Sequence, residues 1–344
     1  MRKITKLIAV TLIMAILTGA LFAQGTTETT GVKKPEVTLK YAHMNVVDNT
    51  SGKYAQFFAD RVFELTKGAV LVEIYPNSQL GSIQEMAEMV SAGTVQLHHN
   101  TWGGLAVLME KLELMDTPYL TASISDAIKL NDITKSPVLI ELNEEFKKTA
   151  NVRILASIYG GSRMLTTSGF PVYSPKDLNG VKIRAIPAKV YITAVKGMGA
   201  IPIAVDWADT PTALATGVAQ GQENPPVTIY TAKLQETQKY LMETRHITAI
   251  GPMVMNEKAY QALKPEYQKA IDQAAYETWE KYNQVSIDSE MDYIKKLVAE
   301  GMTFITKADG LKVDEFKASV DALVAETYSK YAPYYARIKE YLGY

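Results

Sequence analysis

The segment Val181-Lys-Ile-Arg-Ala-Ile-Pro187 alternates apolar and charged side chains, and this period of two predicts a strand over residues 181–186. Glycine and proline mark the limits of the elements expected after it. These are a helix over 188–198, a strand over 201–205, a short helix from Pro211 to Gly217 and a strand over 218–222. Strands that alternate with helices are typical of parallel β-α-β units, so the sequence predicts an α/β sheet.

The same alternation extends toward the N-terminus. We expect strands over 37–42, 69–75, 95–99 and 152–157, and helices over 50–67 and 82–92. Toward the C-terminus, neither glycine nor proline occurs between Pro265 and Gly301, and apolar residues recur at helical spacing. A helix over 265–300 would be about 50 Å long, which is enough to extend across two domains. The alternative is two shorter helices with a break around 284–289.

The first residues have the layout of a secretory signal peptide. A basic start at 2–6 precedes an apolar run over 7–17, and small residues follow up to Ala23. We therefore expect a cleaved signal peptide over 1–23 and a disordered leader over 24–35. An uncleaved anchor is the alternative, but the apolar run is shorter than the roughly 20 residues that span a bilayer. Because no cysteine is present to carry a lipid, we expect an untethered periplasmic protein.

The composition argues against several classes of protein. The 36 Lys and Arg nearly balance the 37 Asp and Glu, so no overall field attracts nucleic acid. A chain without cysteine forms no disulfide, thiolate metal site or thiol nucleophile. Gly160-Gly-Ser-Arg-Met164 lacks the last glycine of a nucleophile elbow, and no zinc-protease or phosphate-loop motif occurs. We therefore expect no enzymatic activity, no cofactor and no metal.

Four residues that could bind an organic acid fall at or just beyond the ends of predicted strands: Arg163, Arg184, Trp207 and Asn224. Arg163 would reach this position through a loop over 159–162. Ligands of open α/β sheets bind beyond the carboxyl ends of the strands, where an arginine can pair bidentately with a carboxylate. Each residue has a structural alternative: a surface ion pair for the arginines, a core position for the tryptophan and a turn for the asparagine. Their coincidence at one rim favours a shared site.

Several motifs in a fixed order resemble those of the extracytoplasmic solute receptors of tripartite ATP-independent periplasmic (TRAP) transporters. They span most of the mature chain, and the last is the most specific: Tyr75-Pro-Asn-Ser-Gln-Leu-Gly81, Thr117-Pro-Tyr119, Gly161-Ser-Arg163, Asp177-Leu-Asn-Gly-Val-Lys-Ile-Arg184, Ala213-Leu-Ala-Thr-Gly217 and Gly221-Gln-Glu-Asn-Pro225. The resemblance implies a receptor that captures a small organic acid and delivers it to a small and a large membrane subunit. We expect it to be a monomer.

The resemblance also implies a periplasmic-binding-protein-like fold. Such a fold has two α/β domains, a ligand cleft between them and a long helix that braces both. We expect residues 36–160 plus 249–288 to form domain I, and 161–248 plus 289–344 to form domain II.

The resemblance further implies roles for individual residues. Arg184 would pair with the ligand carboxylate, Arg163 would supply a second arginine, and Asn224 an amide. An aromatic residue is common in the family where Trp207 stands. Asn45 would lie in the loop after the first strand, where that loop touches the ligand.

The loop Leu97-His-His-Asn-Thr-Trp-Gly-Gly104 departs from the sialic-acid-binding members that the chain otherwise resembles. Those members carry charged ligand contacts where this chain has Thr101 and Gly104, with Trp102 nearby. This difference favours a less polyhydroxylated or partly aromatic ligand. His98 and His99 would point to opposite faces of their strand, so at most one can face the cleft, and a structural role is expected.

The identity of the ligand stays open at this point among a sugar acid, a dicarboxylate and an aromatic or 2-oxo acid. Two other classes of function are alternatives to transport. One is a receptor on the same fold that reports to a signalling partner. The other is an exported enzyme.

Overall fold

The computed structural model describes residues 34–344, so the expected signal peptide and nearly all of the leader lie outside the described residues. The strands within 34–344 are β1 (Val37–Ala42), β2 (Val70–Tyr75), β3 (Leu97–His99), β4 (Val152–Thr167), β5 (Lys182–Ala185), β6 (Ile201–Ala204), β7 (Gly221–Asn224), β8 (Tyr240–Asn256) and β9 (Thr303–Ile305). They form one mixed sheet in the order β2-β1-β3-β8-β4-β7-β5-β6, with β9 paired to β8. The predicted α/β fold is confirmed.

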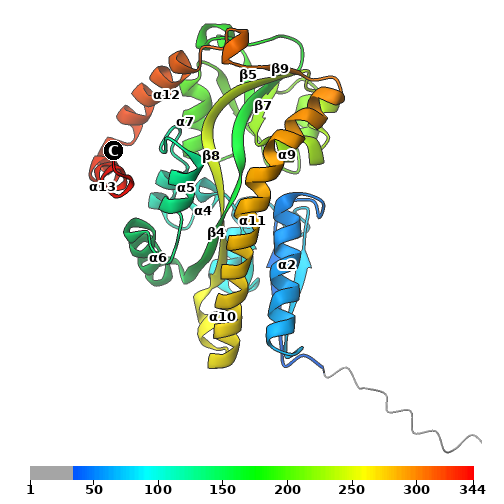
Figure 1. Ribbon diagram of the computed structural model, residues 1–344, viewed down its shortest axis with the longest axis vertical. Helices are drawn as coiled ribbons and strands as arrows, with labels where there is room; N and C mark the ends of the chain where they lie inside the picture. Colours follow the sequence, from blue (N-terminus) through cyan, green and yellow to red (C-terminus); the bar gives the residue numbers. More distant parts are fainter. Residues whose placement is uncertain (1–33) are drawn as a thin grey trace, which may run out of the picture. The chain divides into compact units, whose positions relative to one another are not determined.

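The strands β4 and β8 are long antiparallel partners shared by the whole sheet (Figure 1). One end of the pair carries β3, β1 and β2, where β1 is parallel to both of its neighbours. The other end carries β7, β5 and β6, where β5 is parallel to both of its neighbours. We call the β1–β3 end the first half of the sheet and the β5–β7 end, with β9, the second half.

The predicted strand over 152–157 is confirmed, but its predicted end and the loop expected over 159–162 were wrong. The strand continues to Thr167, because its pairing with β8 persists through three register shifts. One shift lies between Tyr159 and Gly161, and Gly161 has a φ of 114° that favours glycine. The strand β8 was not predicted at all.

The helices within 34–344 include most of those expected from the sequence. They are α2 (Thr50–Leu65), α3 (Ile83–Ala92), α4 (Trp102–Leu105), α5 (Ile124–Leu130), α6 (Pro137–Ala150), α7 (Lys189–Gly197), α8 (Thr210–Ala215), α9 (Pro226–Thr231), α10 (Glu257–Gln261), α11 (Pro265–Ala299), α12 (Val313–Thr327) and α13 (Ala332–Leu342). Short 3₁₀ helices are η1 (Glu110–Asp116), η2 (Pro175–Leu178), η3 (Leu234–Glu236), η4 (Lys307–Asp309) and η5 (Ser329–Tyr331). Local signals fix such boundaries: a capping box of Ser82 and Glu85 begins α3, and Gly93 in the left-handed conformation ends it.

Helices pack on both faces of each half. Successive residues of β1 point to opposite faces, so Tyr41 and Ala42 belong to different hydrophobic clusters. In the second half, Met164 and Leu165 of β4 divide in the same way between two further clusters. The resemblance implied that residues 289–344, which include the C-terminal helix α13, belong to domain II. In the structure, Ile338 of α13 packs in a hydrophobic cluster of the first half.

The long helix α11 runs beside the shared strands from α10 at one end to β9 at the other (Figure 1). The continuous helix is confirmed, and the alternative break around 284–289 is wrong. Beyond that region, the buried Glu290 carboxylate accepts hydrogen bonds from the Ser162 backbone N–H (2.7 Å) and the Tyr159 hydroxyl (2.5 Å), and it pairs with Arg245 of β8 (2.5 Å). These contacts fix α11 to β4 and β8 midway along the shared pair.

Candidate ligand-binding site

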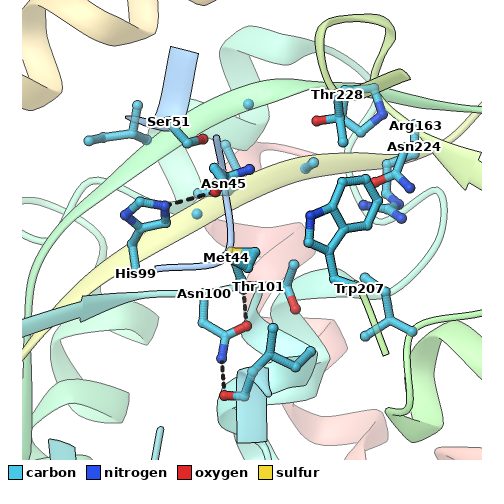
Figure 2. Close-up of a pocket in the computed structure, with 18 of the residues that line it drawn as sticks. Met44, Asn45, Ser51, His99, Asn100, Thr101, Arg163, Trp207, Asn224 and Thr228 are labelled. Carbon is cyan, nitrogen blue, oxygen red and sulfur yellow. Dashed lines mark hydrogen bonds between the residues drawn. The ribbon is translucent and has the colours of Figure 1, made fainter. Parts of the chain in front are cut away.

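A cavity with about 720 Å³ of empty space, part of it open to solvent, lies where the two halves of the sheet meet. Six of the seven predicted site residues line it: Asn45, Thr101, Arg163, Arg184, Trp207 and Asn224. Figure 2 shows Asn45, Ser51 and His99 on one side of the cavity, facing Arg163, Trp207 and Asn224 on the other. The cavity therefore has one wall from each half.

Trp102 is the predicted site residue that the structure places elsewhere. Its side chain is fully buried in a hydrophobic cluster of the first half and does not line the cavity. The Thr101 hydroxyl accepts a hydrogen bond from the Gly104 backbone N–H (3.0 Å) and so caps α4. Trp102 is the first residue of this helix and packs inward, so its expected contact with the ligand is corrected to a core position.

Three of the four residues on the other wall lie at or just beyond strand ends, as predicted. β5, β6 and β7 are parallel, so their carboxyl ends lie at one edge of the sheet. Arg184 lies near the end of β5, Trp207 follows β6, and Asn224 is the last residue of β7. Arg163 is different, because it lies inside β4 rather than beyond a strand end.

Arg184 is a buried guanidinium without a counterion in hydrogen-bonding contact. The side chain is 1 % exposed, its Nε donates to the Val205 carbonyl (2.9 Å), and its Nη1 has no partner among residues 34–344. Burial lowers the pKa of Arg184 to about 10, although the carboxylates of Glu223 and Asp206 act to raise it. The Trp207 ring lies 5.8 Å from the guanidinium carbon. A buried cation whose Nη1 has no partner can pair with an anion that enters the cavity.

Arg163, in contrast, already has a carboxylate partner inside the protein. Its Nη2 donates to Glu223 Oε1 (2.7 Å), its Nε donates to Oε2, and His246 lies 2.9 Å from Oε2. Burial alone would raise the pKa of Glu223, but Arg163 and the hydrogen bond from His246 lower it to about 2. The Arg163 charge is thus neutralised, and this arginine holds a wall of the cavity in place.

Two neutral groups complete the cavity's second wall. Asn224 is 5 % exposed, and its Nδ2 donates to Gln222 Oε1 (2.6 Å), which fixes the orientation of the amide. Trp207 is partly buried against the cluster that contains Leu214 and presents its ring to the cavity. The wall therefore offers an amide and an aromatic face beside the Arg184 guanidinium.

A chain of hydrogen bonds orients the wall from the first half. The Tyr41 hydroxyl lies 2.9 Å from His99 Nδ1, and His99 Nε2 lies 2.9 Å from Asn45 Oδ1. Because a hydroxyl can donate to Nδ1, Nε2 carries the proton and donates to the asparagine oxygen. The Asn45 amide group is thereby held with its Nδ2 free to donate to another acceptor.

Sequence reasoning missed Glu223, His246 and Tyr54. Glu223 stands inside the most specific motif and within the buried strand β7, where an acidic side chain indicates a cationic partner. His246 belongs to the unpredicted strand β8. Tyr54 lies on α2, is 2 % exposed and also lines the cavity.

The family model described as bacterial extracellular solute-binding protein, family 7, matches residues 41–331. The chain belongs to this family. It is a solute-binding protein of the TRAP type, as the motifs predicted.

This chain is similar to the 2,3-diketo-L-gulonate-binding periplasmic protein of Escherichia coli. The two are 28 % identical, over 85 % of this chain and 88 % of the relative. It also resembles the crystal structure of a TRAP periplasmic solute-binding protein from Roseobacter denitrificans with bound L-galactonate (TM-score 0.82, 25 % identity, 89 % and 99 % of the chains covered). A third similar structure comes from Bordetella bronchiseptica, with density assigned to pantoate (TM-score 0.81, 27 % identity, 89 % and 98 % covered).

Within residues 34–344, no helix combines the length and apolarity needed to cross a bilayer. Over the same residues, no three His, Asp or Glu side chains gather in an arrangement that could hold a metal ion.

Three buried histidines should make the stability of the protein depend on pH. Burial lowers the pKa of His43 and of His98 to about 4, and lowers that of His99 well below its usual value. The unfolded chain takes up these protons near pH 6.5, so stability should fall as pH falls from about 6.5 to 4. Burial raises the pKa of Asp116 to about 6, so between about pH 4 and 6 this carboxyl group releases a proton when the chain unfolds. The release offsets one of the protons that the histidines take up.

We therefore expect unfolding to take up at most about two protons. The free energy of unfolding should then fall by at most roughly 3 kcal/mol for each unit by which the pH falls. Urea unfolding at pH 7, 5.5 and 4.5 measures it. His43 has no hydrogen-bond partner at either ring nitrogen among residues 34–344, so His43→Phe should flatten the dependence. A free energy of unfolding that stays constant over this range would contradict the prediction.

Proposed function

We propose that this protein binds a small organic carboxylate in the cavity and delivers it unchanged to the small and large membrane subunits of a TRAP transporter. The observation that carries the proposal is the Arg184 guanidinium, which is buried in the cavity wall with Nη1 unpartnered. A carboxylate would supply the missing acceptor, and a charge-assisted hydrogen bond is stronger than a neutral one. The protein acts in the periplasm as a monomer, after removal of its signal peptide, and without catalysis.

Ligands bound to similar proteins support this proposal. L-galactonate, 2,3-diketo-L-gulonate and pantoate all carry a carboxylate, and these ligands belong to proteins that this chain resembles over most of its length. The position of Arg184 at the carboxyl ends of parallel strands fits the same kind of ligand.

We propose that the cavity closes by movement of one domain toward the other. The domains are 36–160 plus 249–288 and 161–248 plus 289–344, with α13 packed back onto the first. Their boundaries fall midway along β4 and β8 and within α11, so these three elements would bend together. A ligand that touches both walls stabilises the closed form, because only that form surrounds it.

Binding can be tested with the protein purified from the periplasm. Native mass spectrometry should detect a retained organic acid. A thermal-shift screen should find that an organic acid raises Tm, since a ligand at 100 times its Kd adds about 2.7 kcal/mol to stability. The matched neutral control for L-galactonate is galactitol, which lacks the carboxylate. A shift produced by alditols and not by any acid would contradict the proposal.

A further inference from the structure

The cavity carries a single uncompensated positive charge. Arg163 and Arg184 are its only charged lining residues among those the structure describes, and Glu223 neutralises Arg163. Asp206 lies close enough to act on Arg184 electrostatically, which reduces the positive field further. One carboxylate of a ligand therefore finds a partner at Arg184, whereas a second carboxylate finds no free cation.

The wall opposite Arg184 is polar and neutral. His99 is kept neutral by burial, and its hydrogen bonds with Tyr41 and Asn45 leave the Asn45 Nδ2 available as a donor. Asn45 Nδ2 makes no hydrogen bond to any residue within 34–344. A carboxylate placed against this wall would lose its hydration without gaining an ion pair.

Tyr54 supplies an unused hydroxyl on the same wall. Its side chain is 2 % exposed and lines the cavity, and its hydroxyl has no hydrogen-bond partner among residues 34–344 although Ser51 lies beside it. Burial raises the pKa of Tyr54, so the hydroxyl stays protonated and can donate. A buried hydroxyl without a partner is unfavourable, and a ligand oxygen in the cavity would satisfy it.

We propose that the ligand is a hydroxylated monocarboxylate, such as an aldonate, whose carboxylate pairs with Arg184 and whose distal hydroxyls bind Asn45, Ser51 and Tyr54. This proposal rests on the proposed function, because it assumes that an acid binds at Arg184. It selects against dicarboxylates and against acids without hydroxyl groups. Ligand hydroxyls suit this wall because each can both donate and accept.

Matched pairs of ligands test the proposal on the unaltered protein by isothermal titration calorimetry. Each pair differs only in whether the terminal carbon is an alcohol or a carboxylate: L-galactonate and galactarate, D-gluconate and D-glucarate. Hexanoate and succinate serve as acids without hydroxyl groups. In the pair that binds best, we expect the aldonate to bind at least 10-fold more tightly than the aldarate, and more tightly than hexanoate or succinate. An aldarate, succinate or hexanoate that binds more tightly than every aldonate would overturn the proposal.

The variant Tyr54→Phe tests the hydroxyl directly. We expect it to weaken the best aldonate about 10-fold and to leave binding of hexanoate unchanged. The control is Tyr282→Phe, because the Tyr282 ring packs edge-on against Tyr54 (6.1 Å between centroids) while its hydroxyl faces the Lys53 carbonyl, outside the cavity. Equal weakening of both acids, or no weakening of the aldonate, would contradict the role of Tyr54.

The same data separate failure of this inference from failure of the proposed function. If an aldarate or succinate binds most tightly and Arg184→Gln abolishes that binding, the carboxylate receptor stands and only the ligand class is wrong. If no acid binds at all, the proposed function fails and the inference fails with it.

Discussion

Replacing Arg184 with glutamine should lower the affinity for the carboxylate ligand by about 100-fold or more. Removal of one partner from a buried, hydrogen-bonded charge pair weakens binding by about 2–5 kcal/mol. Glutamine keeps a polar group of similar length, so the loss reports mainly the charge and the fork of donors. Isothermal titration calorimetry with the best-binding acid measures the change.

The ligand-free stability of the same variant should stay equal or rise. Arg184 has no ion-pair partner to lose, and removing an uncompensated buried charge relieves its desolvation. The matched control for the affinity measurement is Arg153→Gln. Arg153 lies on the same sheet but outside the cavity, and it pairs with Glu257. Affinity of Arg184→Gln within threefold of the unaltered protein would show that the anchor lies elsewhere.

Replacing Glu223 with glutamine should produce the largest loss of stability of the substitutions considered. The carboxylate is fully buried between Arg163 and His246, and breaking a buried pair from one side costs about 3–5 kcal/mol. Urea unfolding at pH 7 measures it. The control is Glu141→Gln, whose partner Arg337 is 44 % exposed in its side chain, so we expect a loss below about 1 kcal/mol.

The effect of Glu223→Gln should depend on pH in a defined direction. The pKa of Glu223 is lowered to about 2 in the folded protein, against a usual value of 4.5. Its contribution is therefore complete above about pH 4.5 and is lost as pH falls toward 2. If Glu223→Gln and Glu141→Gln lose the same amount at pH 7, the buried pair contributes no more than a surface pair.

The sequence was most informative where local signals set the structure. Strands β1, β2, β5 and β6 and the helix α11 follow from periodicity and from glycine and proline at their ends. The positions of Arg184, Trp207 and Asn224 at one rim follow from parallel strands having their carboxyl ends at one edge. These inferences needed no knowledge of distant contacts.

The errors arise where long-range pairing overrides local signals. Gly160 and Gly161 are typical of a loop, yet β8 supplies partners that keep this part of β4 extended through a bulge. Arg163 was expected at a strand end for that reason. Trp102 was expected to touch ligand because its loop does, but capping by Thr101 begins a helix whose first residue packs into the core. The carboxylate that neutralises Arg163 belongs to Glu223 of β7, and β8 brings His246 to the same carboxylate.

The sharing of β4 and β8 has a consequence for how the molecule unfolds. Neither half of the sheet is complete without both strands, and each strand enters one half directly from the other. Loss of order in one half therefore removes hydrogen bonds on which the other half depends, and we expect the two halves to unfold as a single cooperative unit. Neither half of the sheet can be excised as a continuous segment, and we expect a ligand that binds in the cavity to stabilise residues 34–344 as a whole.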